Sequence, residues 1–200
     1  MADCGCELEA DGDAQRKTLR VVLAINAAMF LVEIVAGVLA SSTGLIADSL
    51  DMLADASVYA ISLYAVGRAA RTRTRAATAS GVLQLALGIG VLIEAVRRFI
   101  GGGEPIGVAM MVMGCIALIA NSVCLWLIAK HKGGDVNFRA SYIFSANDVI
   151  ANIGVIVSGL IVKLSGSQIP DLVIGILIGA VVVRGGIKIL RMASSGEVAS

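Results

Sequence analysis

The chain has 200 residues, of which 58% are hydrophobic and only 16% are charged, and its formal net charge is +1 at pH 7. Soluble domains carry about 25% charged residues, so this composition excludes a soluble globular domain. The balanced charge also gives no indication of nucleic-acid binding. Nearly uncharged stretches of about 20 residues, the length that spans a bilayer as helix, recur along the chain. The sequence therefore predicts an all-α, polytopic membrane protein.

The apolar stretches predict six transmembrane helices, at about residues 20–40, 43–66, 77–98, 106–129, 140–162 and 171–191. The fourth is the clearest, because Ile106 to Ala129 contains no charged residue. The connecting segments are short. We therefore expect an acidic tail over 1–18, a six-helix transmembrane domain over 19–192 and a short tail over 193–200.

The basic residues predict the orientation of these helices. Thirteen of the sixteen lysines and arginines fall on one side of the predicted membrane, and only Arg97, Arg98 and Lys163 fall on the other. Cytoplasmic loops carry an excess of lysine and arginine. Both termini are therefore expected to be cytoplasmic.

The N-terminal tail is acidic where a signal peptide would be basic, so we interpret it as a disordered cytoplasmic segment. Its Cys-Gly-Cys motif could present the thiolates of Cys4 and Cys6 to a soft metal ion. Two further cysteines, Cys115 and Cys124, lie in the fourth predicted helix, where packing is the favoured role. A cytoplasmic tail lies in a reducing compartment, so no disulfide framework is expected.

Carboxylates inside the second predicted helix carry the strongest functional signal. Asp48, Asp51 and Asp55 are spaced i, i+3 and i+7, which places them on one helical face. Ionisable groups in a membrane helix are costly and mark functional sites. No lysine or arginine lies at mid-depth in any predicted helix to pair with them. Protons or a cation are therefore expected between the carboxylates.

The fifth predicted helix repeats this pattern. In Asp-Val-Ile-Ala-Asn, Asp148 and Asn152 are four residues apart, as Asp51 and Asp55 are in Asp-Met-Leu-Ala-Asp. This similarity predicts that the two helices face each other. Asn152 and the neighbouring Asn147 are also costly in lipid unless they bind a metal or donate hydrogen bonds between helices, and both roles stay open.

These residues resemble the cation diffusion facilitators, a family of proton-coupled exporters of divalent metals. The resemblance covers about residues 18–192 and includes the second-helix motif Leu-Ile-Ala-Asp-Ser-Leu-Asp-Met-Leu-Ala-Asp over 45–55. In the family, a metal ligand, three residues and an aspartate recur in helix two, and Asp51 and Asp55 match these positions. We identify the chain as a short, membrane-only member that lacks the family's usual C-terminal cytoplasmic domain.

The resemblance in helix five is partial. Asp148 matches the family's second ligand there, but the first position is Phe144, which cannot bind a metal. A fourth ligand is therefore expected from Asn152, Asn147, Ser145 or water.

The resemblance implies a transporter, not an enzyme, that exports Zn²⁺ or Cd²⁺ in exchange for protons from a multi-pass position in a bacterial inner membrane. Fe, Mn and Co also suit oxygen ligands. No prosthetic group is implied; the divalent metal is the substrate. Asp48 and Glu33 are expected to handle protons or to support the metal ligands.

A homodimer in the lipid bilayer is also implied by the resemblance. The Gly-Ile-Leu-Ile-Gly segment from Gly175 to Gly179 has the small-xxx-small spacing that lets helices approach closely, either between two copies or within one.

The alternative function is a proton-coupled exporter of small organic cations. Such a site favours aromatic walls, whereas only 4% of the residues are aromatic.

Overall fold

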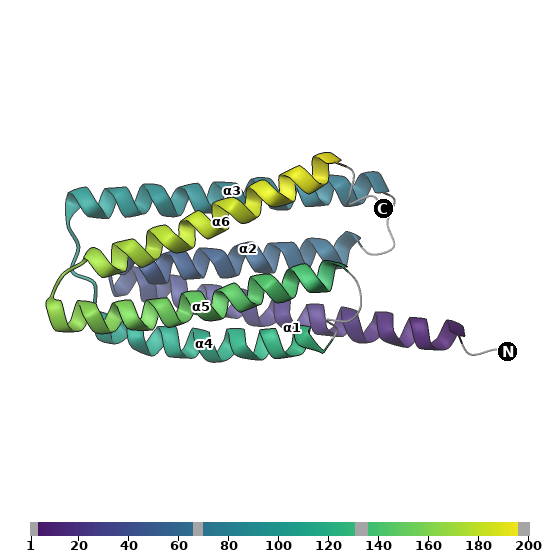
Figure 1. The fold of residues 1–200 in the computed structure, drawn as a ribbon, viewed down its shortest axis with the longest axis horizontal. Helices are drawn as coiled ribbons and strands as arrows, with labels where there is room; N and C mark the ends of the chain where they lie inside the picture. Colours follow the sequence, from purple (N-terminus) through teal and green to yellow (C-terminus); the bar gives the residue numbers. More distant parts are fainter. Residues whose placement is uncertain (1–3, 66–69, 131–135, 196–200) are drawn as a thin grey trace.

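The structure is a computed structural model, and it describes residues 4–65, 70–130 and 136–195, apart from the side chains of 4–12, 136–144 and a few other helical residues. Over the described residues the chain forms six long α-helices that run side by side (Figure 1). Their bounds are α1 Cys4–Leu39, α2 Thr43–Ala65, α3 Ala70–Gly101, α4 Gly107–Ala129, α5 Val136–Ser165 and α6 Ile169–Ser195. The predicted all-α class is confirmed.

Five helices within the described residues are long and apolar enough to cross a membrane, over Arg16–Leu39, Ala77–Gly101, Gly107–Ala129, Ser145–Ser165 and Ile169–Ser194. α2 falls outside this group because three aspartates interrupt its apolar sequence. Its 23 residues are nevertheless enough to span a bilayer core. The chain is therefore a multi-pass membrane protein, as predicted. α1 begins and α6 ends at the same end of the bundle (Figure 1).

Three helices begin earlier than the sequence pattern predicts. α1 begins at Cys4, so the expectation of a disordered tail is wrong, and α3 and α5 begin at Ala70 and Val136, inside segments expected to be loops. The extensions of α1 and α3 are rich in alanine and in charged residues, most of which favour helix. The length of an apolar stretch therefore predicts the membrane-spanning part of a helix, but it does not predict where the helix ends outside the membrane.

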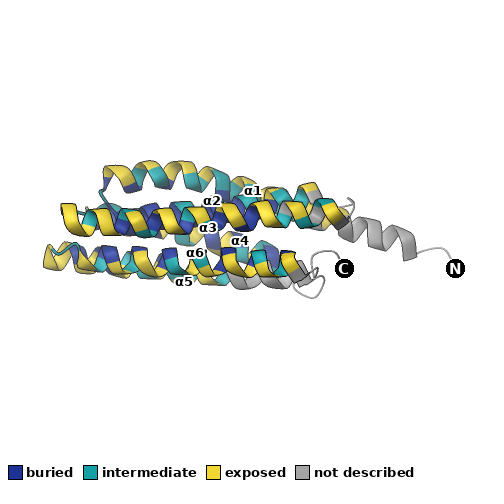
Figure 2. Cartoon of the chain, turned by 90° about the horizontal axis from the view of Figure 1, so that it is seen from above, coloured by how far each residue is buried: buried dark blue, intermediate teal, exposed yellow. Residues whose placement is uncertain are grey.

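α2 is the central helix of the bundle and contacts each of the other five. The remaining helices pack mainly in pairs, α3 against α6 and α4 against α5, while α1 packs mainly against α2. Every residue from Ser42 to Ser49 is buried, whereas exposed residues follow the outer faces of the other helices (Figure 2). Polar side chains on α2 are therefore surrounded by protein and not by lipid.

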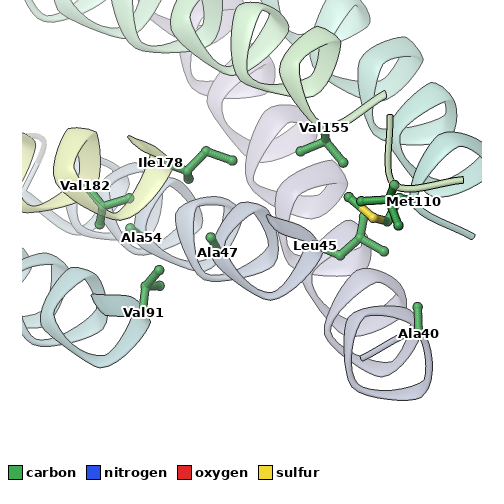
Figure 3. Close-up of a cluster of buried hydrophobic side chains, with 10 residues drawn as sticks. Ala40, Leu45, Ala47, Ala54, Val91, Met110, Val155, Ile178 and Val182 are labelled. Carbon is green, nitrogen blue, oxygen red and sulfur yellow. The ribbon is translucent and has the colours of Figure 1, made fainter. Parts of the chain in front are cut away.

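The main apolar cluster joins α2 to its neighbours. Leu45 of α2 lies beside Met110 of α4 and Val155 of α5 (Figure 3). Further along, Val182 of α6 and Val91 of α3 belong to the same cluster. These contacts hold α2 in a fixed position between the two helix pairs.

Glycines allow the close approach of α6 to its neighbours. A Cβ atom built on Gly179 would lie 2.9 Å from the Cγ1 atom of Val91, and one built on Gly175 would lie 2.7 Å from the Cγ2 atom of Thr43. The small-xxx-small pattern of α6 is therefore used for packing within one chain, which was one of its two expected roles.

The packing of α3 on α6 predicts different outcomes for two glycines that lie two residues apart. A Cβ atom on Gly88 would lie 2.7 Å from the Cγ2 atom and 2.9 Å from the backbone N of Val183, whereas Gly90 has no heavy atom within 4 Å. We expect Gly88→Val to lower the free energy of unfolding by about 2 kcal/mol, through overpacking. Gly90→Val is the matched control and should change it little. Thermal unfolding of the two purified variants in detergent measures the difference, and equal losses would contradict this packing.

Candidate metal centre

Four carboxyl side chains are buried in the middle of the bundle. Glu33 of α1 is 0% exposed, and Asp48, Asp51 and Asp55 of α2 are 1%, 8% and 7% exposed. The i, i+3, i+7 spacing of the aspartates follows one face of α2. Since α2 is enclosed by the other helices, these groups are held away from lipid.

α5 adds a fifth carboxyl group to this region. Asp148 lies within hydrogen-bonding reach of both Asp51 and Asp55. On the next turn of α5, Asn152 is fully buried, and its Nδ2 donates a 2.8 Å hydrogen bond to the backbone O of Asp148. No donor among the described residues reaches the Oδ1 atom of Asn152. The structure thus brings the acids of α2 and α5 together and leaves one amide oxygen beside them without a partner.

The carboxyl groups approach one another in pairs and do not yet enclose one point. Within the described part of the chain, no three His, Cys, Asp or Glu side chains are placed to hold a metal ion together. The contact of α2 with α5 is one of the smallest between helices in the bundle. A change of side-chain rotamers, or a small approach of α5 to α2, would bring oxygens from all three aspartates onto one cation.

A chain of polar side chains continues from Asp55 toward the end of the bundle where α1 begins. The hydroxyl of Tyr59 lies within hydrogen-bonding reach of Asp55 and 3.5 Å from the Oγ of Ser145. Nearby, the Nδ2 of Asn26 donates to the Sγ of Cys124 at 3.7 Å. The sequence analysis assigned no role to Asn26 or Tyr59. The position of Tyr59 one helical turn after Asp55 was the available signal.

Other candidate residues lie apart from this centre. Asn147 is exposed on α5, so the structure does not group it with Asp148. The side chains of Cys4, Cys6 and Phe144 lie outside the described residues. Near the far end of α3, Glu94 accepts hydrogen bonds from Arg97 and Arg98, the shortest at 2.6 Å and 2.7 Å respectively.

A sixth buried acid, Asp171 of α6, lies against the first turn of α2 and was not predicted from the sequence. Its carboxylate accepts hydrogen bonds from the backbone N–H groups of Thr43 and Gly44, at 2.6 Å and 3.0 Å, and from the hydroxyl of Ser42 at 2.6 Å. The Oγ of Ser42 in turn accepts from the N–H of Leu45. A helix begins with unpaired N–H groups and a partial positive charge, so a buried carboxylate from α6 stabilises α2 at this end.

A search of family models matches residues 19–195 to one described as the cation efflux transmembrane domain. The chain belongs to the cation efflux family. Membership confirms the resemblance to the cation diffusion facilitators, a family whose members are transporters and not enzymes.

Curated relatives of this cation efflux protein are bacterial, which fits the expected inner membrane. The zinc transporter ZitB of Escherichia coli is 28% identical over 92% of this chain and 62% of its own length. The metal cation efflux system protein CzcD of Cupriavidus metallidurans is 26% identical over 82% of this chain and 55% of its own length. A Bacillus velezensis protein named cadmium, cobalt and zinc/H(+)-K(+) antiporter is 22% identical over 90% of this chain. The chain thus spans less than two thirds of the length of these relatives.

The carboxylate of Asp171 should be needed to hold α2 against α6. We expect Asp171→Ala to lower the free energy of unfolding by about 3 kcal/mol, because buried N–H donors lose a charged acceptor. Glu104→Ala removes an exposed carboxylate from the loop before α4 and serves as the control. Thermal unfolding of both variants in detergent gives the comparison. A stability loss in Asp171→Ala no larger than in Glu104→Ala would show that the carboxylate does not stabilise this end of α2.

Proposed function

We propose that this protein exports divalent metal cations in exchange for protons, at a carboxylate-rich site between α2 and α5. Zn²⁺ and Cd²⁺ are the first candidates for the substrate, followed by Fe²⁺, Mn²⁺ and Co²⁺. The relatives named above carry zinc, cadmium and cobalt in their names, which supports zinc and cadmium as first candidates and cobalt as a further one.

The approach of Asp148 to both Asp51 and Asp55 is the observation that carries the proposal. Carboxylates buried together repel each other, and a divalent cation between them removes that repulsion. Membership of the cation efflux family supplies the second support.

Asp51, Asp55 and Asp148 are the proposed protein ligands, with Asn152 as the fourth. The free, buried Oδ1 of Asn152 supports this choice. Asn147 is the weaker candidate because its side chain is exposed. Four oxygen ligands suit hard and borderline cations, so carboxylates are compatible with zinc and also with manganese or iron.

Proton exchange follows from the same chemistry. Carboxylates must lose their protons to hold a cation, so protons and metal compete. Rocking of one helix group against another around a buried site is the expected form of alternating access. The small contact of α2 with α5 makes the α4–α5 pair the group whose movement would open and close the site. Asp48 and Glu33 are proposed to handle protons.

The remaining features of the proposal concern the surroundings of the bundle. Both termini are proposed to lie in the cytoplasm, because most lysines and arginines lie on the same side of the membrane as the termini. The protein is proposed to act as a homodimer in the bilayer. Cys4 and Cys6 are proposed to capture a soft metal ion at the cytoplasmic end of α1.

Removal of single carboxylates tests the proposed site. We expect Asp51→Ala, Asp55→Ala and Asp148→Asn each to weaken zinc binding by about a hundredfold, since loss of one charge from a buried ionic group costs ~3 kcal/mol. Zinc-driven proton flux in proteoliposomes should disappear in the same variants. Isothermal titration and a pH-sensitive dye trapped in the vesicles measure the two effects.

Glu94→Gln is the control for this series, because Glu94 is paired with two arginines near the end of α3. It should leave zinc binding and flux at the wild-type level. Wild-type flux in both Asp55→Ala and Asp148→Asn would rule out the site between α2 and α5.

A further inference from the structure

A second pair of buried carboxyl groups lies between α1 and α2. The side chains of Glu33 and Asp48 are within hydrogen-bonding reach of each other, and both residues are fully buried. None of their four carboxyl oxygens receives a hydrogen bond from a donor among the described residues. Two carboxylates can only accept hydrogen bonds. A bond between them therefore requires a proton on one of the two.

Among the described residues, the surroundings of this pair supply no positive charge. α4, which packs against both α1 and α2, contains no Asp, Glu, Lys, Arg or His in its whole length, and its Cys115 is exposed. On α6, Asp171 caps the start of α2, and on α3 Glu94 is paired with arginines. Asp48 in turn acts electrostatically on Asp51 and Asp148, and both of these are acids.

Two ionised carboxylates in contact, without donors and away from water, carry both a repulsion and a desolvation cost. If the two carboxyl groups share a single proton, one negative charge is removed and a hydrogen bond forms between them. The pair then has a net charge of −1 and behaves as one coupled titrating unit.

We propose that the Glu33–Asp48 pair is a further proton-carrying site of this protein, separate from the carboxylates that hold the metal, and that it releases its proton when a divalent cation binds. The inference rests on the proposed function. Asp48 is one helical turn from Asp51, so a cation held by Asp51 lies close enough to lower the proton affinity of the pair. The cation enters, the shared proton leaves to water, and the reverse occurs on the other side of the membrane.

If the proton site is separate from the metal site, a variant of Glu33 should change proton release without changing metal binding. Glu33→Gln keeps the size of the side chain and provides an N–H group that donates to Asp48, but it removes the shared proton. The variant should therefore still bind zinc and release fewer protons as it does so. Loss of a metal ligand would instead weaken the binding itself.

The experiment is titration of Zn²⁺ into the full chain in detergent, in two buffers of different ionisation enthalpy, which gives the number of protons released per zinc. We expect Glu33→Gln to release about one proton fewer than the wild type, with a zinc Kd within about threefold. Glu94→Gln, the control, should release as many protons as the wild type. If Glu33→Gln does not fold, Asp48→Asn carries the same expectation.

Three results would overturn the inference while leaving the proposed function in place. Unchanged proton release in Glu33→Gln would show that the pair holds no exchangeable proton. Loss of zinc binding in the folded variant would place Glu33 in the metal site. A second zinc equivalent that is present in the wild type and absent in the variant would make the pair a cation site. Failure of the wild type to bind zinc would reject the proposed function and this inference with it.

Discussion

Carboxylates cannot face lipid at low cost, and this constraint governs the arrangement of the six helices. α2 carries three aspartates on one face and is the helix that touches all the others. The five surrounding helices supply apolar outer faces, so the acids are buried in protein. The same enclosure brings Glu33 of α1 close to Asp48, and it brings Asp148 of α5 close to Asp51. The packing of the bundle and the proposed metal site therefore depend on the same helix.

The bundle combines firm and loose contacts. α2 is fixed to α6 by the Asp171 carboxylate at its first turn, and glycines let α3 and α6 pack closely. The contact of α2 with α5 is small by comparison. A site divided between a fixed helix and a loosely held one can gain or lose a ligand with little disturbance of the core. That property suits the proposed function, in which the site binds and then releases the same ion.

Much of the architecture could be predicted from the sequence, because uncharged length and helical spacing act locally. The six helices and the common face of Asp48, Asp51 and Asp55 follow from such patterns. The ends of helices that extend into water could not be predicted in this way, because they depend on helix propensity and not on apolar length. The role of Asp171 also escaped prediction, because its partners lie more than 120 residues away in sequence. Likewise, spacing alone could not rank Asn152 above Asn147, whose exposure depends on how α5 is turned toward the bundle.

The central claim is that α2 and α5 together hold the transported metal. The most direct measurement is a structure of the zinc-loaded protein with the metal located by anomalous scattering. The account predicts one ion with Asp oxygens from both helices at about 2.0–2.2 Å. An ion bound elsewhere, at the cysteines of the α1 terminus or between Glu33 and Asp48, with no zinc between α2 and α5, would contradict it.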